Sequence, residues 1–476
     1  TYYATGSNEN LGTLSTTSHT LISEDNGTTW KKGQCIIHGD GDGDGDGDGD
    51  GDVNLPENVP VYSRNLSTYN IDLSQSSTSG LSAGGFLASQ FHVAFSNRII
   101  GAGVVAGGPY YCAEGKLGWG PPYGTATDYG ALGACMSKPS AINLSAIYNK
   151  AVSYSNSGAI DPLSNLVDDK IYVIHGTGDQ TVLQGVGDTV DDWYLMAGVD
   201  PSNIFYKNDL NMGHAMPLLD AFNDPNHNAS NTCSTTTLAP WMSHCSFDGA
   251  GEILKHIYGN LNSRKDMLNG KIIEFDQSTF TSGTPDSISL NDKGYAYIPD
   301  ACSNGEECKI HVVWHGCEQV YNSIPENRGH EPENKTFGLL MVRYSGYNQW
   351  ADENNMIILY PQAKKKASGL QTTYGNPKGC FDWWGYAGAD YATKNGAQMK
   401  AVMNMMEHLA SGYKGGDGDG DGDGDGDGDG DGDSCNHCSS YSCCTSFGCS
   451  GYSYVNGSMK CYNLVGYALT PCNCWQ

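Results

Sequence analysis

Three polar residues have the types and the chain order that a serine hydrolase needs. Ser82 lies in the stretch GLSAG, an instance of Gly-x-Ser-x-Gly. Small residues flank such a serine because the strand-to-helix turn that carries it is strained and crowded. Asp179 follows in IYVIHGTGDQTV, and His214 follows in NMGHAMP. Ser, Asp, His is the chain order of α/β-hydrolases, so the sequence predicts a nucleophile, an orienting acid and a base.

Each of these residues also has a simpler interpretation. Taken alone, Asp179 is an ordinary turn residue and His214 an ordinary loop residue, but all the simple interpretations must hold together for the triad to fail. The stretch DTVDDWYLMAG predicts a helix, and its acids are expected on the solvated face of that helix: Asp188, Asp191 and Asp192. Three further histidines are expected to pack near strand ends: His175, His311 and His315.

Residues 311–319, HVVWHGCEQ, pose a problem of order. An apolar run ends in a tight His-Gly-Cys turn, which is how α/β-hydrolases often build part of an oxyanion hole. In the usual chain order this loop precedes the nucleophile, whereas here it follows Ser82. Either the stretch is an unrelated strand end, or the fold has been cut and rejoined.

The elements that must position these residues are those of an α/β protein. We expect a strand at the start of YNIDLSQSSTS, before Ser82, and a helix in FLASQFHVAFS after it, because its apolar residues recur at helical spacing. The run IYVI predicts a strand that ends just before Asp179. The motif therefore has the strand, turn and helix that it requires.

From about residue 62 to residue 413 the chain resembles the secreted poly(3-hydroxybutyrate) depolymerases of the circularly permuted α/β-hydrolase type. The resemblance rests on five stretches: GLSAGGF, VVAGGPYYC, HCSFDGAGEILKHIYGNLNSR, GYNQWADENNMIILYPQA and GCFDWWGY. It implies a serine esterase with Ser82, Asp179 and His214 as the catalytic residues. It also implies oxyanion donors at the backbone N–H groups of Ala83 and Cys317. Trp383 corresponds to the family's crevice tryptophan, with core packing as the alternative.

The order of elements supports such a permutation. After His214, SFDGAGEILKHIYGNLNSR resembles the final helix of a hydrolase, and KIIEF and GYAYIPD resemble the opening strands. HVVWHGC then serves as the third strand, YSGYNQWADENNM as a helix and IILYPQA as the next strand. NGAQMKAVMNMMEHLAS predicts an amphipathic helix. The cut is therefore expected between this helix and the strand near Ile71, and the old termini are joined through residues 259–271.

Proximity in the chain and the resemblance imply four disulfides in this domain: Cys112–Cys135, Cys233–Cys245, Cys302–Cys308 and Cys317–Cys380. The last pair would tie the oxyanion loop to the loop of Trp383. Two stretches depart from the family pattern, IPENRGHEPENKTFG and KKKASGLQTTYGNPK. We expect both to border the crevice, where they bear on substrate choice.

Two runs of Gly-Asp repeats divide the chain. We expect an N-terminal Ser/Thr/Asn-rich segment (1–38), a linker (39–52), the catalytic domain (53–415), a second linker (416–433) and a Cys-rich module (434–476). Glycine entropy and repelling aspartates favour flexible linkers. Calcium binding is disfavoured because the rest of an EF-hand loop is missing. The last segment holds eight cysteines, which favour four disulfides over a zinc site and suggest a polymer-binding module. Cys35 is left over.

The net charge of −27 argues against nucleic acid as a partner. The one basic cluster, Lys364–Lys366, is expected to be a solvated loop. No apolar run reaches the length needed to span a bilayer, and we expect that any signal peptide has been removed. The 17 cysteines favour an oxidising compartment. So do six Asn-x-Ser/Thr sites, at Asn26, Asn65, Asn143, Asn228, Asn334 and Asn456.

Together these observations predict a secreted, extracellular glycoprotein that hydrolyses poly(3-hydroxybutyrate) or a related polyester. Its partner would be the insoluble polymer or its oligomers, with no nucleic acid and no membrane, and we expect a monomer that uses no cofactor and no metal. One alternative is an esterase that removes feruloyl or acetyl groups from plant polysaccharide. The other is a non-catalytic polymer-adhesion protein.

Overall fold

The structure is a computed structural model of the 476-residue chain. It describes residues 59–413, apart from 121–124, 225, 327–334 and 368–374, and the backbone of short strands nearer each end. The chain divides into two compact units, Thr1–Lys414 and Gly415–Gln476. The cavity and the residues that line it lie in the first unit.

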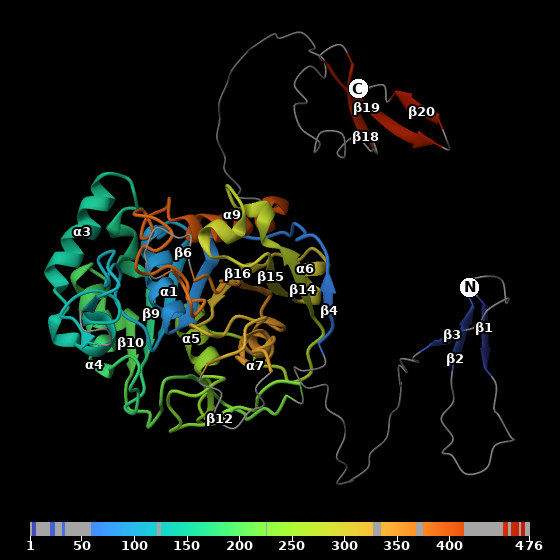
Figure 1. Cartoon of the computed structure of the whole chain (residues 1–476). Helices are drawn as coiled ribbons and strands as arrows, with labels where there is room; N and C mark the ends of the chain where they lie inside the picture. Colours follow the sequence, from blue (N-terminus) through green and yellow to red (C-terminus); the bar gives the residue numbers. More distant parts are fainter. Residues whose placement is uncertain are drawn as a thin grey trace, which may run out of the picture. The chain divides into compact units, whose positions relative to one another are not determined.

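A nine-stranded, mostly parallel sheet forms the centre of the first unit (Figure 1). In spatial order the strands are β10 (Ile204–Lys207), β9 (Lys170–Ile174), β6 (Ile99–Val105), β5 (Ser76–Leu81), β16 (Lys309–Trp314), β17 (Met356–Tyr360), β15 (Lys293–Ile298), β14 (Lys271–Asp276) and β4 (Val61–Ser63). The first six strands, from β10 to β17, are joined by five parallel pairings. β15 pairs antiparallel with both β17 and β14, and β4 pairs parallel with β14 at the edge of the sheet.

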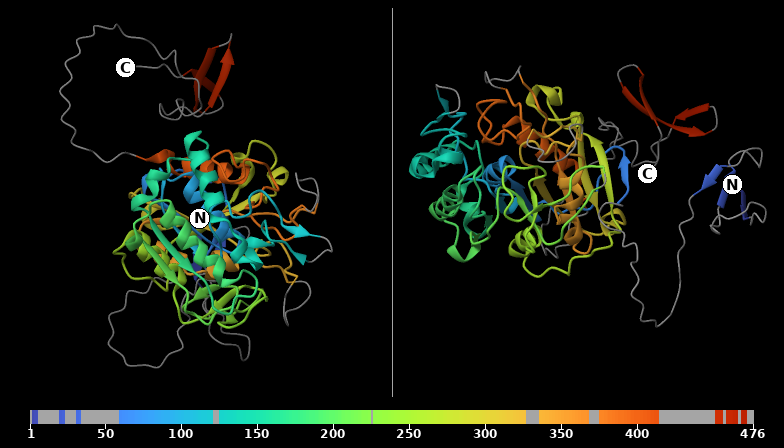
Figure 2. Two further views of the ribbon diagram at one scale, coloured as in Figure 1. Left: turned by 90° about the vertical axis from the view of Figure 1, so that its left-hand side faces the viewer. Right: turned by 60° about the horizontal axis from the view of Figure 1, so that its bottom comes forward.

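Helices cover both faces of this sheet, as Figures 1 and 2 show. Because side chains alternate along a strand, six of the strands (β6, β9, β16, β17, β15 and β14) contribute to two apolar clusters, one on each face. One cluster packs under α1 (Ala83–Ala94), α3 (Leu144–Asn156), α4 (Gln184–Met196) and α9 (Ala397–Leu409). The other packs under α5 (Gly249–Tyr258), α7 (Leu340–Tyr344) and α8 (Tyr347–Ala351). The fold is therefore α/β with three layers.

The strand before Ser82 lies later in the chain than expected. β5 is SSTSGL, whereas the predicted start of YNIDLSQSSTS makes only an isolated bridge between Ile71 and Cys308. Its side chains are fully buried although they are polar. Three of their four hydroxyls are satisfied by neighbours: Ser77 and Ser79 Oγ lie 2.6 and 2.7 Å from the two ring nitrogens of His311, and the Thr78 hydroxyl bonds to the Val312 carbonyl. A polar sequence can thus form a central strand because its partners lie on other elements.

A second difference concerns the helix expected in YSGYNQWADENNM. Of that stretch only Tyr347–Ala351 is helical (α8), and α7, which was not predicted, ends at its first residue, Tyr344; Gly346, which has φ of 94°, separates the two helices. A Cβ at Gly346 would lie 3.2 Å from the Cβ of Ala250 on α5. The close approach of α5 and the left-handed backbone explain the break. The expected strands KIIEF, GYAYIPD, HVVW and IILY, and the helices α4, α5 and α9, are present.

The smaller elements lie in connections or near the chain ends. In the first unit they are α2 (Ala134–Ser137), α6 (Asp300–Ser303), β7 (Trp119–Gly120) with β8 (Thr125–Ala126), and the three-stranded sheet of β11 (Met216–Leu218), β13 (Met242–His244) and β12 (Asn231–Thr232). Near the N-terminus are β1 (Tyr2–Thr5), β2 (Thr20–Ser23) and β3 (Lys31–Gly33). The second unit has β18 (Gly451–Val455), β19 (Ser458–Val465) and β20 (Ala468–Pro471).

Several predictions fall on residues outside the described part of the chain. Both Gly-Asp runs, Cys35, the pairing of the last eight cysteines and the glycosylation sites at Asn26, Asn334 and Asn456 belong there. So do the centres of the two stretches that depart from the family pattern.

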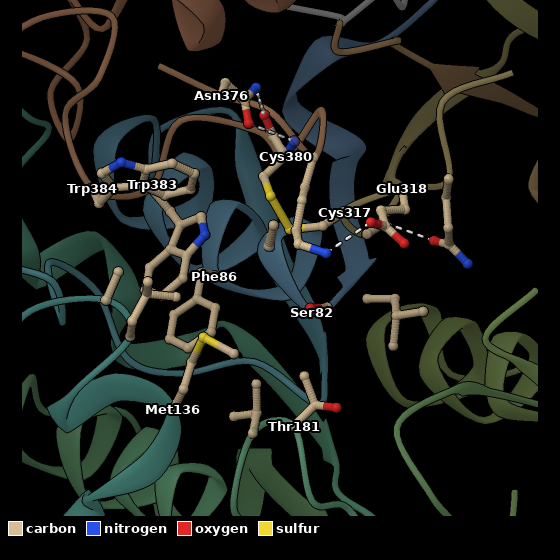
Figure 3. A pocket seen from close by; sticks show the side chains of 18 of the residues that line it. Ser82, Phe86, Met136, Thr181, Cys317, Glu318, Asn376, Cys380, Trp383 and Trp384 are labelled. Carbon is tan, nitrogen blue, oxygen red and sulfur yellow. Dashed lines mark hydrogen bonds and ion pairs between the residues drawn. A yellow bond between two sulfur atoms is a disulfide. The ribbon is translucent and has the colours of Figure 1, made fainter. Parts of the chain in front are cut away.

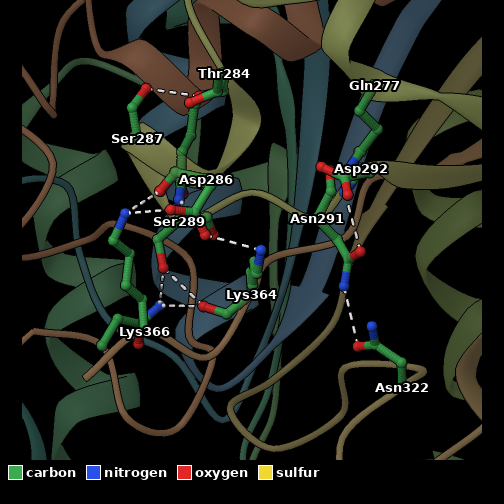
Figure 4. A network of polar contacts seen from close by, with 12 residues as sticks. Gln277, Thr284, Asp286, Ser287, Ser289, Asn291, Asp292, Asn322, Lys364 and Lys366 are labelled. Atoms are coloured by element: carbon green, nitrogen blue, oxygen red, sulfur yellow. Dashed lines mark hydrogen bonds and ion pairs between the residues drawn. The ribbon is translucent and has the colours of Figure 1, made fainter. Parts of the chain in front are cut away.

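The lysine loop is only partly solvated, because the side chains of Lys364 and Lys366 are 36% and 16% exposed. Lys364 and Lys366 both contact the carboxylate of Asp286, at 2.8 and 2.6 Å (Figure 4). Lys365 Nζ donates to the Ile324 carbonyl at 3.0 Å. The lysines therefore fasten the loop after β17 to neighbouring loops.

Within the described residues, no helix combines the length and apolar composition that crossing a membrane requires.

Candidate active site

Ser82 occupies a sharp turn between β5 and α1. Its φ of 58° and ψ of −121° place this non-glycine residue in a strained conformation. The flanking glycines allow the turn to approach β16: a Cβ on Gly84 would lie 2.2 Å from the Trp314 carbonyl oxygen, and one on Gly80 would lie 2.4 Å from the Gly84 oxygen. Gly-x-Ser-x-Gly is therefore a packing requirement here as well as a sequence pattern.

Asp179 and His214 form a buried pair. Asp179 Oδ2 lies 2.7 Å from His214 Nδ1, while Oδ1 accepts the N–H groups of Thr181 and Val182 at 2.8 and 3.0 Å. Burial alone raises the pKa of Asp179, but the charge and hydrogen bond of His214, with the other donors, outweigh it. The net pKa of Asp179 is lowered. The carboxylate is therefore held ionised and directed at Nδ1, which leaves His214 Nε2 for other chemistry.

Ser82 and His214 both line one cavity of about 480 Å³ (Figure 3). Its walls are mainly apolar and include Met136, Val182 and Trp241. An apolar site with a few convergent polar groups is the usual form of a small-molecule site. The structure thus brings the three predicted residues to one place.

The predicted oxyanion donors, Ala83 and Cys317, line the same cavity. Among the described residues, neither backbone N–H donates a hydrogen bond. The loop that carries Cys317 is held from both sides: Gly316 N donates to Gln319 Oε1 at 2.7 Å, and Gln319 Nε2 donates to the Pro240 carbonyl at 2.9 Å. Two fixed N–H groups without a partner are what an oxyanion hole requires.

Trp383 forms part of the aromatic wall. Its ring stacks on Phe86 with centroids 3.9 Å apart, and Trp384 packs edge-on against it (Figure 3). All three residues line the cavity. Trp383 is only 4% exposed, so packing and cavity lining are not exclusive here. The indole N–H groups of Trp383 and Trp384 have no hydrogen-bond partner within the described residues.

Four disulfides are present in the described residues, and they are the pairs that the resemblance implies: Cys112–Cys135, Cys233–Cys245, Cys302–Cys308 and Cys317–Cys380. Cys317 and Cys380 both line the cavity. Glu318, the next residue, adds two further links, because its N–H donates to the Lys378 carbonyl at 2.7 Å and its carboxylate pairs with Lys378 Nζ at 2.8 Å. The oxyanion loop is thus fastened to the loop before Trp383.

The competing residues lie elsewhere or play other parts. Asp188 and Asp192 are exposed on α4 and Asp191 is half-buried, as expected of a solvated face. Burial lowers the pKa of His311 to about 3 and that of His315 to about 4, so both remain neutral packing residues. His175 is buried as expected, but it also lies 3.5 Å from Asp179 Oδ2.

Sequence reasoning missed several residues of the site. Phe86, Gln319 and Trp384 line the cavity, and each follows closely on a motif that was noticed, in GLSAGGF, HGCEQ and FDWWGY. Of the two stretches that depart from the family pattern, the second borders the cavity through residues 375–378. The described residues of the first do not line it, although Glu326 reaches Lys378 at 3.0 Å. No group of three or more metal-ligating side chains is present in the described residues.

Comparison with known proteins identifies relatives of this chain, although no family model matches it. It is 39% identical over 356 residues to the poly(3-hydroxybutyrate) depolymerase of Delftia acidovorans, covering 74% of this chain and 63% of that protein. It is 35% identical over 358 residues to the polyhydroxybutyrate depolymerase of Talaromyces funiculosus, covering 94% of that protein.

Solved structures give the same picture. Two PHB depolymerase structures, one from Penicillium funiculosum and one complexed with an R3HB trimer, match 74% of this chain and all of their own. Each match has a TM-score of 0.61 and 32% sequence identity. Since the alignment covers nearly the whole Talaromyces protein at 35% identity, this chain belongs to the poly(3-hydroxybutyrate) depolymerase family.

Proposed function

We propose that the chain is a serine esterase that depolymerises poly(3-hydroxybutyrate) or a related polyester. The observation that carries the proposal is the convergence at one apolar cavity of Ser82, the buried Asp179–His214 pair, and two unpartnered backbone N–H groups. Each of these groups has a defined part in acyl transfer. The relatives bear the name of this activity.

The mechanism follows from the geometry. Ser82 Oγ attacks the ester carbonyl while His214 takes its proton, and His214 then protonates the leaving alkoxide. Asp179 fixes the His214 tautomer, since its carboxylate accepts from Nδ1. The Ala83 and Cys317 N–H groups stabilise the oxyanion. Water then attacks the acyl-enzyme by the same route, and the reaction needs no cofactor.

A short-side-chain polyester suits the cavity. Between its two ends such a polymer offers methyl groups and hydrogen-bond acceptors but no donors. The cavity supplies an apolar wall for the methyl groups, and the unpartnered backbone N–H groups of Ala83 and Cys317 for an ester oxygen. One related structure holds an R3HB trimer. No observation favours feruloyl or acetyl esters, or a non-catalytic adhesion protein.

The direct test is Ser82→Ala. We expect it to abolish the loss of turbidity of a polyester suspension while adsorption to the polymer remains intact. Ser89→Ala is a matched control, because Ser89 is a buried serine on the same helix whose hydroxyl bonds to the Gly108 carbonyl outside the cavity. Activity retained by the Ser82 variant would overturn the mechanism, and faster turnover of feruloyl esters than of hydroxybutyrate oligomers would overturn the substrate.

We also infer that the fold is circularly permuted. In chain order the sheet jumps from β5 to its neighbour β16, more than 200 residues later. If the chain is read from β14, consecutive strands become neighbours with two exceptions, as expected of compact folds: β16 and β17 exchange places, and the edge strand β4 pairs with β14. The two sides of the inferred cut are in contact, since Tyr69 N donates to the Leu409 carbonyl at 2.7 Å.

The remaining organisation is likewise a proposal. We infer a secreted, extracellular monomer with the catalytic domain at 53–415, linkers at 39–52 and 416–433, and a polymer-binding module at 434–476. The disulfides fit an oxidising compartment. Deleting 434–476 is expected to weaken adsorption to polymer film while leaving hydrolysis of a soluble hydroxybutyrate ester unchanged. Unchanged adsorption would exclude the binding role.

A further inference from the structure

His175 is a buried histidine that the mechanism above does not use. It follows directly after β9, and its side chain is fully buried. Its Nε2 lies 2.8 Å from the Val182 carbonyl oxygen and 3.5 Å from Oδ2 of Asp179. The imidazole therefore spans the turn that presents the catalytic carboxylate.

The contacts around this turn form a closed polar ring. His175 Nε2 donates to the Val182 carbonyl, and the Val182 N–H donates to Asp179 Oδ1 at 3.0 Å. Oδ2 of the same carboxylate then faces His175 Nε2 again. Val182 also lines the cavity. The His175 imidazole therefore contacts both the carboxylate that orients His214 and a residue of the cavity wall.

The protonation of His175 is fixed by these partners. A carbonyl oxygen can only accept, so the proton must sit on Nε2. Burial lowers the pKa of His175, against the opposing effects of Asp179 and the Val182 carbonyl, so the ring is neutral and Nδ1 is bare. Within the described residues, Nδ1 has no hydrogen-bond partner. A residue present for packing alone would avoid an unpartnered buried nitrogen, which destabilises a fold.

We propose that His175 is a positioning residue for catalysis. Its Nε2–H holds the turn from Asp179 to Val182 so that the carboxylate keeps its aim at His214. The inference rests on the proposed esterase function and deepens it. A misplacement of about 1 Å in a catalytic group costs on the order of 10²-fold in rate, so a loosened carboxylate should lower kcat far more than it changes KM.

The test compares two variants on a soluble hydroxybutyrate ester. His175→Met has a similar volume and no donor, and we expect kcat to fall about ten- to a hundredfold with KM within about threefold. In His175→Gln the amide nitrogen can take the place of Nε2, so we expect most of kcat to return. Melting temperatures of both variants are measured in parallel.

His92 supplies the matched control. It is equally buried and bonds to Asp169 Oδ2 and to the Tyr194 hydroxyl, both at 2.9 Å, but neither of these partners lines the cavity, whereas Val182 does. His92→Met should lower the melting temperature with little change in kcat. The proposal is overturned if His175→Met keeps its kcat, or if His175→Gln is as slow as His175→Met.

The experiment also distinguishes a folding failure of the variant, and a failure of the esterase mechanism, from a failure of the role proposed for His175. If His175→Met does not fold, His175→Asn replaces it, because its shorter amide cannot reach the Val182 carbonyl. Equal rates for the Asn and Gln variants would then overturn the proposal. If Ser82→Ala is active, the esterase mechanism itself fails. If Ser82→Ala is inactive and His175→Met is as fast as the parent, only the role of His175 fails.

Discussion

At the scale of single residues, two buried carboxylates show opposite electrostatics. Asp179 faces a histidine and two backbone N–H groups, and its pKa is lowered in spite of burial. Asp382 has no cationic partner among the described residues, so burial raises its pKa to about 6, although the N–H groups of Gly385, Tyr386 and Ala387 oppose the rise. Asp382 precedes Trp383, and its carboxylate shapes the loop that carries this side chain.

The raised pKa of Asp382 predicts a pH dependence of stability. A carboxyl whose pKa rises on folding stabilises the fold at low pH, and that contribution is lost as pH rises from about 4 through about 6. The unfolding free energy of the parent relative to Asp382→Asn should therefore fall over this window, by up to about 3 kcal/mol. Urea unfolding of both proteins at half-unit pH steps measures the difference.

Asp286 gives a control of opposite sign. Its hydrogen bonds to Lys364 and Lys366 lower its pKa, so its contribution is lost only as pH falls below its ordinary value of 3.8 (Figure 4). The unfolding free energy of the parent relative to that of Asp286→Asn should be nearly constant between pH 4 and 6. If the parent becomes more stable relative to Asp382→Asn as the pH rises from 4 to 6, the raised pKa of Asp382 is contradicted.

At the scale of elements, periodicity predicted the apolar strands and the long helices. It failed for β5, where the buried hydroxyls of Ser77, Thr78 and Ser79 are satisfied by His311, Trp314 and Tyr347 on other elements. It failed again where Gly346 divides α7 from α8. Both failures have one cause: the deciding partner is distant in sequence, and a local pattern carries no record of it.

The Cys317–Cys380 disulfide joins two loops of the site, and its removal should affect both stability and rate. It closes a 63-residue separation, so the chain-entropy argument gives a loss of about 4 kcal/mol in Cys317→Ala/Cys380→Ala. The backbone N–H of residue 317 remains but is less well fixed. We expect kcat to fall about ten- to a hundredfold, below the 10²–10³-fold cost of losing a donor altogether.

The control for this pair is Cys302→Ala/Cys308→Ala, which opens a separation of 6 residues. Neither cysteine lines the cavity, so its stability should fall by about 2 kcal/mol with kcat unchanged. Denaturant unfolding and single-substrate kinetics on both double variants decide the matter. Equal kcat values for the two would show that the Cys317 bridge has no part in positioning the oxyanion loop.

At the scale of the whole molecule, the sheet and its two apolar clusters do not depend on where the chain is opened. The strands that carry Ser82 and HGC are neighbours through the pairing of Val313 with Ser79 and of Trp314 with Gly80. At the other end of the chain, His408 Nε2 lies 2.7 Å from the Leu66 carbonyl. The present ends of the domain are therefore close enough to be joined.

A rearranged chain should fold and function. It would begin at Gly270, run to Tyr413, cross a short Gly-Ser linker to Thr68 and end at Asn269. We expect circular dichroism like that of residues 68–413 in their present order, and kcat on a soluble ester within about tenfold, because every strand pairing is kept except that of the edge strand β4, which both chains lack. An insoluble or inactive product, with the control soluble and active, would argue against the permuted description.

The sequence by itself determined the chemistry that we propose. Ser82, Asp179, His214 and the HGC turn could be found because motif, order and strand-end position are local properties, and the four disulfide pairs followed from resemblance. Only the tertiary structure decided how these parts are held. Three examples are contacts between loops and elements: His175 with Asp179, Gln319 with the loop of Cys317, and the ring of Phe86 with that of Trp383. Such contacts depend on distances across the fold, and distances arise only once the chain has packed.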